Sequence, residues 1–240
     1  MSRFLRAEWR KLLMANYAIS PDALASLVPA HTELDLWQDT CYVSLVGFMF
    51  QRTRVMGLPI PWHINFEEVN LRFYVRYKAP SGEWRRGVVF VREIVPRTMI
   101  TFVANTLFGE HYMTLPMRHK WDISAENINV QYEWQYQQQW YSMSAQALPQ
   151  LQDLRAGSEE EFIAEHYWGY TRRRNGSTSQ YEVEHPAWQW YEVKDYQLKG
   201  DIPALYGSQF AEAFQSPPRS VFLAEGSPIA VRFAEKISRE

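Results

Sequence analysis

The chain has little cysteine, little net charge and no long apolar run, and each shortage excludes a class of protein. One cysteine, Cys41, among 240 residues cannot form an internal disulfide. A formal net charge of −2 provides no basic surface for nucleic acid or for an anionic membrane. No apolar run approaches the roughly 20 residues that a membrane-spanning helix needs. We therefore expect neither nucleic acid nor a membrane as a partner.

The ends and the middle of the chain also lack familiar signals. The N-terminal segment MSRFLRAEWRKLL has neither the apolar region nor the small-residue cleavage site of a signal peptide. With a single cysteine, this predicts a cytoplasmic protein. No segment has the composition of a linker, so residues 1–240 are expected to form one domain. Nothing in the sequence excludes a homo-oligomer.

Aromatic residues are abundant, and they favour a fold made mainly of β-strands. They amount to 15% of the chain, with 10 Trp, 14 Tyr and 13 Phe. Such side chains are typical of pleated, half-buried surfaces. Alternating segments predict strands at residues 41–50, 65–75, 84–95, 99–108 and 228–233, two more between 121 and 143, and a type I′ hairpin around Asn175-Gly176. The spacing of these strands predicts a barrel or a sandwich.

Helix signals are few and short. Ser20 and Pro21 mark the start of a helix that Pro29 ends, and Ser158 with Glu161 forms a capping box for a second helix through Ala164. A third short helix is expected at residues 209–214, and a helical turn at 9–14 before the first strand. The predicted fold class is therefore mainly β with short peripheral helices.

Common catalytic and metal-binding motifs are missing. The sequence has no glycine-rich phosphate loop, no nucleophile elbow and no metal-binding helix motif. The six histidines have no standard ligand spacing, so we expect no metal and no cofactor. Cys41 lies in an apolar run and is expected to be a core residue. Residues 172–174 are three arginines before the hairpin turn; they indicate a solvated tip or a partner contact.

The segment NFEEVNLRFYV, residues 65–75, carries the best candidate for a site. In a strand, Glu68, Asn70, Arg72 and Tyr74 share one face, because side chains alternate with a period of two. This polar row fits the solvent side of an ordinary antiparallel strand. It also fits the interior of a closed barrel, where Glu68 and Arg72 would pair or bind a ligand. The pattern alone leaves both interpretations open.

A resemblance favours the interior. In order, the segments AEWRKLLMANYAISPDALASLVPAHTELDLW, YVSLVGFMF, GLPIPWH, FEEVNLRFYV, RRGVVFV, EHYWGYT and VEHPAW resemble the YqjF-like family of uncharacterised conserved proteins. That family is similar in fold to acetoacetate decarboxylase. The resemblance implies a closed antiparallel barrel of conical shape, with the polar row of residues 68–74 turned inward.

The same resemblance argues against decarboxylation. That chemistry needs a lysine amine of lowered pKa that forms a Schiff base. The segment comparable to the lysine region is Tyr112 to Pro116, followed by Met117, and a thioether cannot form an imine. Lys120 is three positions away, on the opposite face of a strand. The carboxylate-binding arginine is also missing, since Ala18 follows Tyr17, whereas Glu68 retains the acid.

The resemblance and the residues together predict a small-molecule-binding barrel. The candidate ligand-binding residues are Glu68, Asn70, Arg72, Tyr74, His111 and Met117. One alternative is a structural or interaction protein whose barrel is filled by aromatic side chains. Another is an enzyme that uses acid/base chemistry through Glu68 and His111. His185, in the family segment VEHPAW, is expected at a structural turn or in contact with the ligand.

Overall fold

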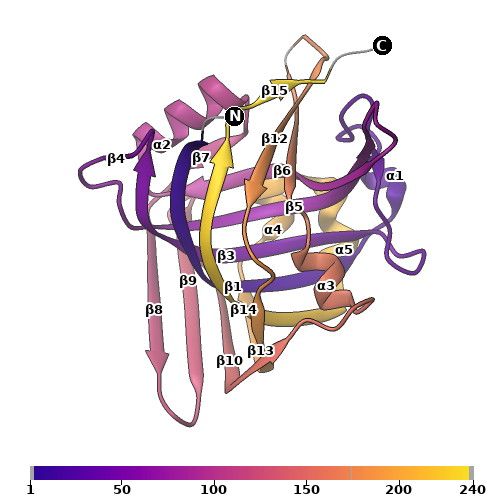
Figure 1. The fold of residues 1–240 in the computed structure, drawn as a ribbon. Helices are drawn as coiled ribbons and strands as arrows, with labels where there is room; N and C mark the ends of the chain where they lie inside the picture. Colours follow the sequence, from indigo (N-terminus) through magenta and orange to yellow (C-terminus); the bar gives the residue numbers. More distant parts are fainter. Residues whose placement is uncertain (1–2, 174, 238–240) are drawn as a thin grey trace.

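A computed structural model describes residues 3–173 and 175–237 (Figure 1). Its core is a ring of seven strands, in the order β12, β11, β6, β5, β3, β1 and β14. The bounds are β1 Arg3–Ala18, β3 Tyr42–Val55, β5 Phe66–Lys78, β6 Trp84–Val95, β11 Trp168–Arg172, β12 Thr178–Glu184 and β14 Ser220–Arg232. The predicted fold class, mainly β with short helices, is confirmed.

The ring closes between its last strand and its first. Val183 and Glu184 of β12 pair with Val231 and Ala230 of β14. Most neighbouring strands are antiparallel, as predicted, but β11 and the short β7 (Tyr112–Thr114) each pair with β6 in parallel. The expected conical antiparallel barrel is therefore present as a ring with two parallel pairings on β6.

A second layer covers one face of this ring. It consists of β8 (Met117–Ile123), β9 (Ile128–Tyr136), β10 (Gln139–Asp153) and β13 (Gln189–Lys199), which continue the sheet from β14. β8, β9 and β10 run across the direction of β3 and β5 (Figure 1). The odd-numbered residues of β5, such as Leu71 and Phe73, share a buried cluster with side chains of this layer. At Gly47 a Cβ atom would lie 2.8 Å from the Tyr132 ring, so only glycine allows β3 and β9 to approach this closely.

Short elements decorate the two layers. The remaining strands are β2 (Glu33–Leu34), β4 (Leu58–Pro59) and β15 (Glu235–Lys236). The helices are α1 (Pro21–Leu24), α2 (Thr98–Val103) with a π-helical continuation (Ala104–Phe108), α3 (Glu159–Ala164), α4 (Ile202–Tyr206), a 3₁₀ turn (Ser208–Phe210) and α5 (Ala211–Gln215). None of the helices in the described part of the chain is long and apolar enough to cross a membrane.

The sequence predicted the capping box and the hairpin correctly but not the type of turn. The capping box is present, since the Ser158 hydroxyl accepts a hydrogen bond from the Glu161 amide at 3.2 Å. The hairpin between β11 and β12 is also present. The Arg173 amide bonds to the Ser177 carbonyl oxygen and the Gly176 amide to the Arg173 carbonyl oxygen, so the loop has three residues and is not the two-residue type I′ turn that was predicted. Of the three arginines at residues 172–174, Arg174 lies outside the described residues.

Two predicted secondary-structure elements were also wrong. Residues 99–108 form α2 and its continuation rather than a strand. Ile100, Val103 and Ala104 face the interior while Phe102 is exposed, which is helical spacing that an apolar run had masked. Residues 9–14 are part of the long β1, with no helical turn; the irregularity there is a bulge at Lys11, whose φ is 53°.

Candidate functional site

The ring encloses a cavity of about 280 Å³. Most of its wall is apolar and aromatic, with side chains that include Trp9, Leu12, Phe48, Phe50, Phe90 and Phe108. The lining also includes Ile60 and Met99, which are 39% and 57% exposed. The cavity therefore approaches the surface between the loop after β4 and helix α2.

The polar row of β5 lies inside the ring. Glu68 and Asn70 are each 2% exposed and Arg72 is 7% exposed, and all three line the cavity. Tyr74 is buried at the end of the row, where its hydroxyl is 2.6 Å from the Ser44 hydroxyl, and it does not line the cavity. The interpretation of this row as a solvent face is therefore wrong.

The expected ion pair between Glu68 and Arg72 is absent. One Glu68 oxygen accepts a hydrogen bond from Asn70 Nδ2 at 2.9 Å, and the other accepts one from the Tyr112 hydroxyl at 3.2 Å. Arg72 Nη2 instead contacts the Ile163 carbonyl oxygen at 3.4 Å, and Arg72 Nε has no partner. Glu68 and Arg72 are four positions apart on an extended strand, which places their Cα atoms about 13 Å apart.

Two further buried carboxyl groups join Glu68, and sequence reasoning missed both. Glu93 on β6 is 2% exposed and lies opposite Asn70 in the sheet. Glu110, before β7, is 6% exposed and accepts a hydrogen bond from the Thr171 hydroxyl at 2.6 Å. We call Glu68, Glu93 and Glu110 the acidic cluster; all three line the cavity.

A β-bulge in β6 turns the Glu93 side chain to the cavity, which the alternation of the sequence does not predict. Arg72 pairs with Phe90 and Leu71 pairs with Arg92, so one extra residue of β6 lies between these pairs. Phe90 and Glu93 therefore both face the cavity, although their numbers differ by three. A strict period of two would have placed Glu93 on the opposite face.

His111 and Met117 are not brought to the cavity. Glu110 and Tyr112 line it, so His111 between them points away and is exposed. The proposed acid/base pair of Glu68 with His111 is therefore wrong. Met117 begins β8, in the second layer, and packs against the buried cluster that this layer shares with β5, so it does not line the cavity either.

Burial controls the charge of the acidic cluster. It raises the pKa of Glu68 to about 7, an effect that the neighbouring Glu110 reinforces and that the hydrogen bonds from Asn70 and Tyr112 oppose. Burial likewise raises the pKa of Glu110 to about 7, against hydrogen bonds with Thr171 and Tyr181. The pKa of Glu93 is raised well above its usual value, first by burial and then by the charges of Glu110 and Glu68. The cluster therefore retains protons at neutral pH.

Two histidines line other parts of the cavity. His166 Nε2 is 3.2 Å from Asp35, whose carboxylate also accepts a 2.7 Å hydrogen bond from Arg86. Burial lowers the pKa of His166 to about 4, so its imidazole is neutral near pH 7. His185 stacks on Trp188 with ring centroids 4.3 Å apart, and burial lowers its pKa to about 4 as well. Both histidines present neutral rings to the cavity.

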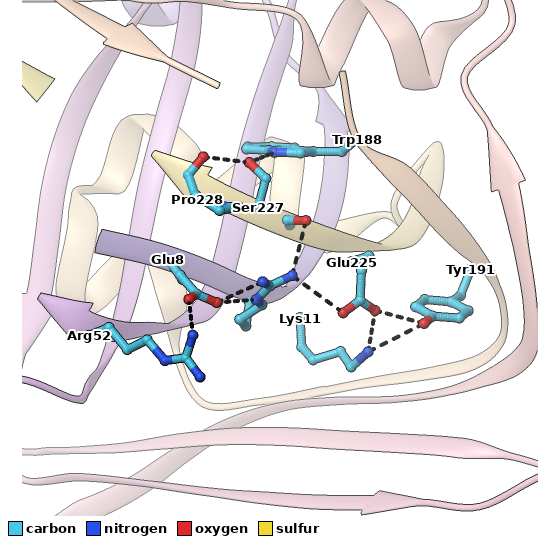
Figure 2. A network of polar contacts seen from close by, with 10 residues as sticks. Glu8, Lys11, Arg52, Trp188, Tyr191, Glu225, Ser227 and Pro228 are labelled. Carbon is cyan, nitrogen blue, oxygen red and sulfur yellow. Dashed lines mark hydrogen bonds and ion pairs between the residues drawn. The ribbon is translucent and has the colours of Figure 1, made fainter. Parts of the chain in front are cut away.

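Lys11, a buried lysine, lies in a separate network (Figure 2). Its Nζ pairs with Glu225 and is 3.4 Å from the Tyr191 hydroxyl, and Figure 2 shows these three side chains together. Lys11 does not line the cavity, and neither does any other lysine of the described residues. The cavity therefore lacks the amine that Schiff-base chemistry requires.

The described residues do not form a metal site. Among residues 3–173 and 175–237, no three His, Cys, Asp or Glu side chains are placed to hold a metal ion. The single cysteine, Cys41, is buried, and burial raises the pKa of its thiol to about 11. Such a thiol is not a reactive nucleophile.

Comparison with solved structures supports the fold. The chain is similar to acetoacetate decarboxylase from Legionella pneumophila subsp. pneumophila str. Philadelphia 1, with a TM-score of 0.68 and 12% identity over 98% of this chain and 87% of that one. It is similar to an acetoacetate decarboxylase-like enzyme from Sphingomonas wittichii RW1, with a TM-score of 0.68 and 11% identity over 100% and 95% of the two chains. It is also similar to the enduracididine biosynthesis enzyme MppR complexed with pyruvate, with a TM-score of 0.69 and 10% identity over 99% of this chain and 92% of that one. At these identities the likeness shows the fold alone.

Comparison of sequences shows the family. The chain is 37% identical over 79 residues to the uncharacterized protein YqjF of Bacillus subtilis (strain 168). That match spans about a third of each protein, 32% of this chain and 33% of YqjF. The model of the DUF2071 family, described as an uncharacterized conserved protein, matches residues 6–228. The chain therefore belongs to the DUF2071 family of uncharacterised conserved proteins.

Proposed function

We propose that this protein binds a small molecule inside the ring of seven strands. The observation that carries the proposal is the cavity of about 280 Å³, whose wall is mostly apolar and includes buried polar groups. Ligand sites in proteins have this character and begin near this volume, at roughly 300 Å³. A structural barrel filled by aromatic side chains would leave no such space.

Unpartnered polar atoms support a ligand rather than a packing defect. Asn70 Oδ1, Glu93 Oε2 and Glu110 Oε2 are buried without a hydrogen-bond partner. Each such atom costs about 1–3 kcal/mol when nothing satisfies it. A ligand that supplies donors to them recovers part of that free energy on binding.

The reaction of acetoacetate decarboxylase is not part of the proposal. The fold is shared, but folds of one type carry different chemistries, and function follows from the site. Here the cavity has three carboxyl groups and no lysine in the described residues. The proposed function is therefore binding, without Schiff-base catalysis.

A cavity-filling variant tests the proposal. Ala164 on α3 lines the cavity and is 3% exposed, so Ala164→Phe places a ring in the space. 1-Hexanol is a suitable first probe, and the cavity tryptophans Trp9, Trp168 and Trp188 report its binding by fluorescence. The parent should bind and Ala164→Phe should bind at least tenfold more weakly. Ala125→Phe, at an exposed site between β8 and β9, is the control and should bind as the parent does.

Two outcomes would overturn the proposal. One is that neither 1-hexanol nor charged molecules of the same chain length change the fluorescence of the parent. The other is that Ala164→Phe, folded by circular dichroism, binds as tightly as the parent. Ala104→Phe, at a second lining position, covers the case in which Ala164→Phe does not fold.

A further inference from the structure

Resting on the proposed function, we infer that the ligand is an amine with an apolar body, whose ammonium group is bound among Glu68, Glu93 and Glu110. The inference concerns which end of a ligand meets the acidic cluster. It is carried by the chemistry and position of the unpartnered atoms in the cavity wall.

Asn70 Oδ1 is an unpartnered acceptor, and Glu93 Oε2 and Glu110 Oε2 are unpartnered acceptors once their carboxyl groups ionise; the unpartnered donor Arg72 Nε lies two positions beyond Asn70 on β5. Asn70 Oδ1, Glu93 Oε2 and Glu110 Oε2 come from β5, β6 and the segment before β7, so they reach the cavity from three elements. An ammonium group has three N–H donors and no acceptor. A carboxylate ligand would instead bring two more acceptors to a place that already has too many.

The surrounding side chains leave the cluster short of positive charge. The ionisable groups nearest to it are the hydroxyls of Tyr112 and Tyr181, and neither is a cation. Arg72 favours the ionised form of Glu68, but it makes no ion pair with any carboxylate of the described residues. His166 and His185 are neutral. Arg92 pairs with Leu71 and so points to the other face of β6, where its guanidinium donates to the Leu205 carbonyl oxygen.

The rest of the wall selects for an apolar body. Phe48, Phe50, Phe90 and Phe108 line the cavity together with the carboxyl groups. A strongly hydrated cation without an apolar part would lose its water and gain no hydrophobic burial. An alkyl or aryl amine can contact both the carboxyl groups and the apolar part of the wall.

Proton release follows from this arrangement. Because burial raises the pKa of Glu68 and Glu110 to about 7, part of the cluster is protonated at neutral pH. An arriving ammonium group stabilises the ionised carboxylates, so protons leave as it binds. For one such carboxyl, the ionised fraction rises about tenfold between pH 6 and pH 8. The affinity for an amine should therefore rise by about tenfold over that range.

Three molecules with one chain length test the inference: hexylamine, 1-hexanol and hexanoate. Calorimetry and tryptophan fluorescence at pH 6, 7 and 8 measure their affinities for the parent. We expect hexylamine to bind most tightly at pH 8, with about a tenfold rise from pH 6 and with proton release seen in buffers of different ionisation enthalpy. 1-Hexanol should bind with the same affinity at each pH.

Variants locate the ammonium group. Glu110→Gln keeps the acceptor for the Thr171 hydroxyl but removes the charge, and it should weaken hexylamine by about tenfold without changing 1-hexanol. Glu126→Gln, at an exposed site, should change neither. Tighter binding of 1-hexanol or hexanoate than of hexylamine at pH 8 overturns the amine while leaving the proposed function intact. An amine affinity that is constant or falling from pH 6 to pH 8 also overturns it. If none of the three molecules binds, the proposed function itself has failed.

Discussion

Replacing Glu110 with Gln should make the protein more stable at pH 8. The carboxyl is buried, and burial raises its pKa from the usual 4.5 to about 7. The folded state therefore holds this proton more tightly than the unfolded state does. Between pH 4.5 and pH 7 the unfolded state ionises first, so the free energy of unfolding falls as the pH rises. Below pH 4.5 both states are protonated and there is no penalty.

The size of the effect follows from the two pKa values. The difference between about 7 and 4.5, at about 1.36 kcal/mol for each pH unit, is about 3 kcal/mol at pH 8. Glutamine has no charge to bury, and its carbonyl oxygen can still accept the hydrogen bond from Thr171. We expect Glu110→Gln to be up to about 3 kcal/mol more stable than the parent at pH 8 and within about 1 kcal/mol of it at pH 4.5.

Urea melts at pH 4.5, 6 and 8 provide the measurement. Glu126→Gln is the matched control, because an exposed carboxylate should change the free energy of unfolding by no more than about 0.5 kcal/mol at any pH. The reasoning is refuted if Glu110→Gln and the parent lose the same stability between pH 4.5 and pH 8. That result would mean that Glu110 ionises as easily in the folded protein as in the unfolded chain.

Three further changes test other parts of the interior. Arg72→Met should leave the free energy of unfolding unchanged within about 1 kcal/mol, because the guanidinium is buried without an ion pair. A loss of about 3 kcal/mol in urea melts would show that the Arg72 guanidinium neutralises a carboxylate. Asp35→Asn should lower the free energy of unfolding by about 3 kcal/mol at pH 7, since it breaks the buried contacts with Arg86 and His166. The loss should become smaller as the pH falls through the lowered pKa of Asp35, and equal losses at pH 7 and pH 3 would contradict this. Borohydride with acetoacetate should leave the mass of the protein unchanged, because no lysine of the described residues lines the cavity; a covalent adduct would refute this.

Period-two patterns located the polar row but not its partners. Glu68, Asn70 and Arg72 share a face because β5 pairs regularly with β3 from residue 66 to 73, so the sequence predicts which residues point together. Whether that face meets water or a cavity depends on strands far along the chain, such as β11 and β12, which no local pattern places. The resemblance to a barrel family supplied that information.

The missed residues have local geometric causes. Glu93 was hidden by the bulge in β6, which shifts its side chain to the cavity face. Glu110 was passed over in favour of His111 next to it, and the two point in opposite directions because β7 pairs with β6 through Tyr112. A prediction from strict alternation of side chains along a strand cannot detect one inserted residue. The inserted residue is seen only in the pairing between β5 and β6.

The cost of the acidic cluster is itself a reason to assign it a role. One carboxyl with a pKa near 7 costs about 3 kcal/mol of stability above neutral pH, and a typical protein has only about 5–15 kcal/mol in total. Apolar side chains at residues 68, 93 and 110 would avoid this cost and would fill the cavity as well. Polar residues that break the rules of a stable core are expected where a site needs them. An amine that enters the cavity converts the same three carboxyl groups from a cost into binding energy, because each gains a charged donor that the protein alone does not provide.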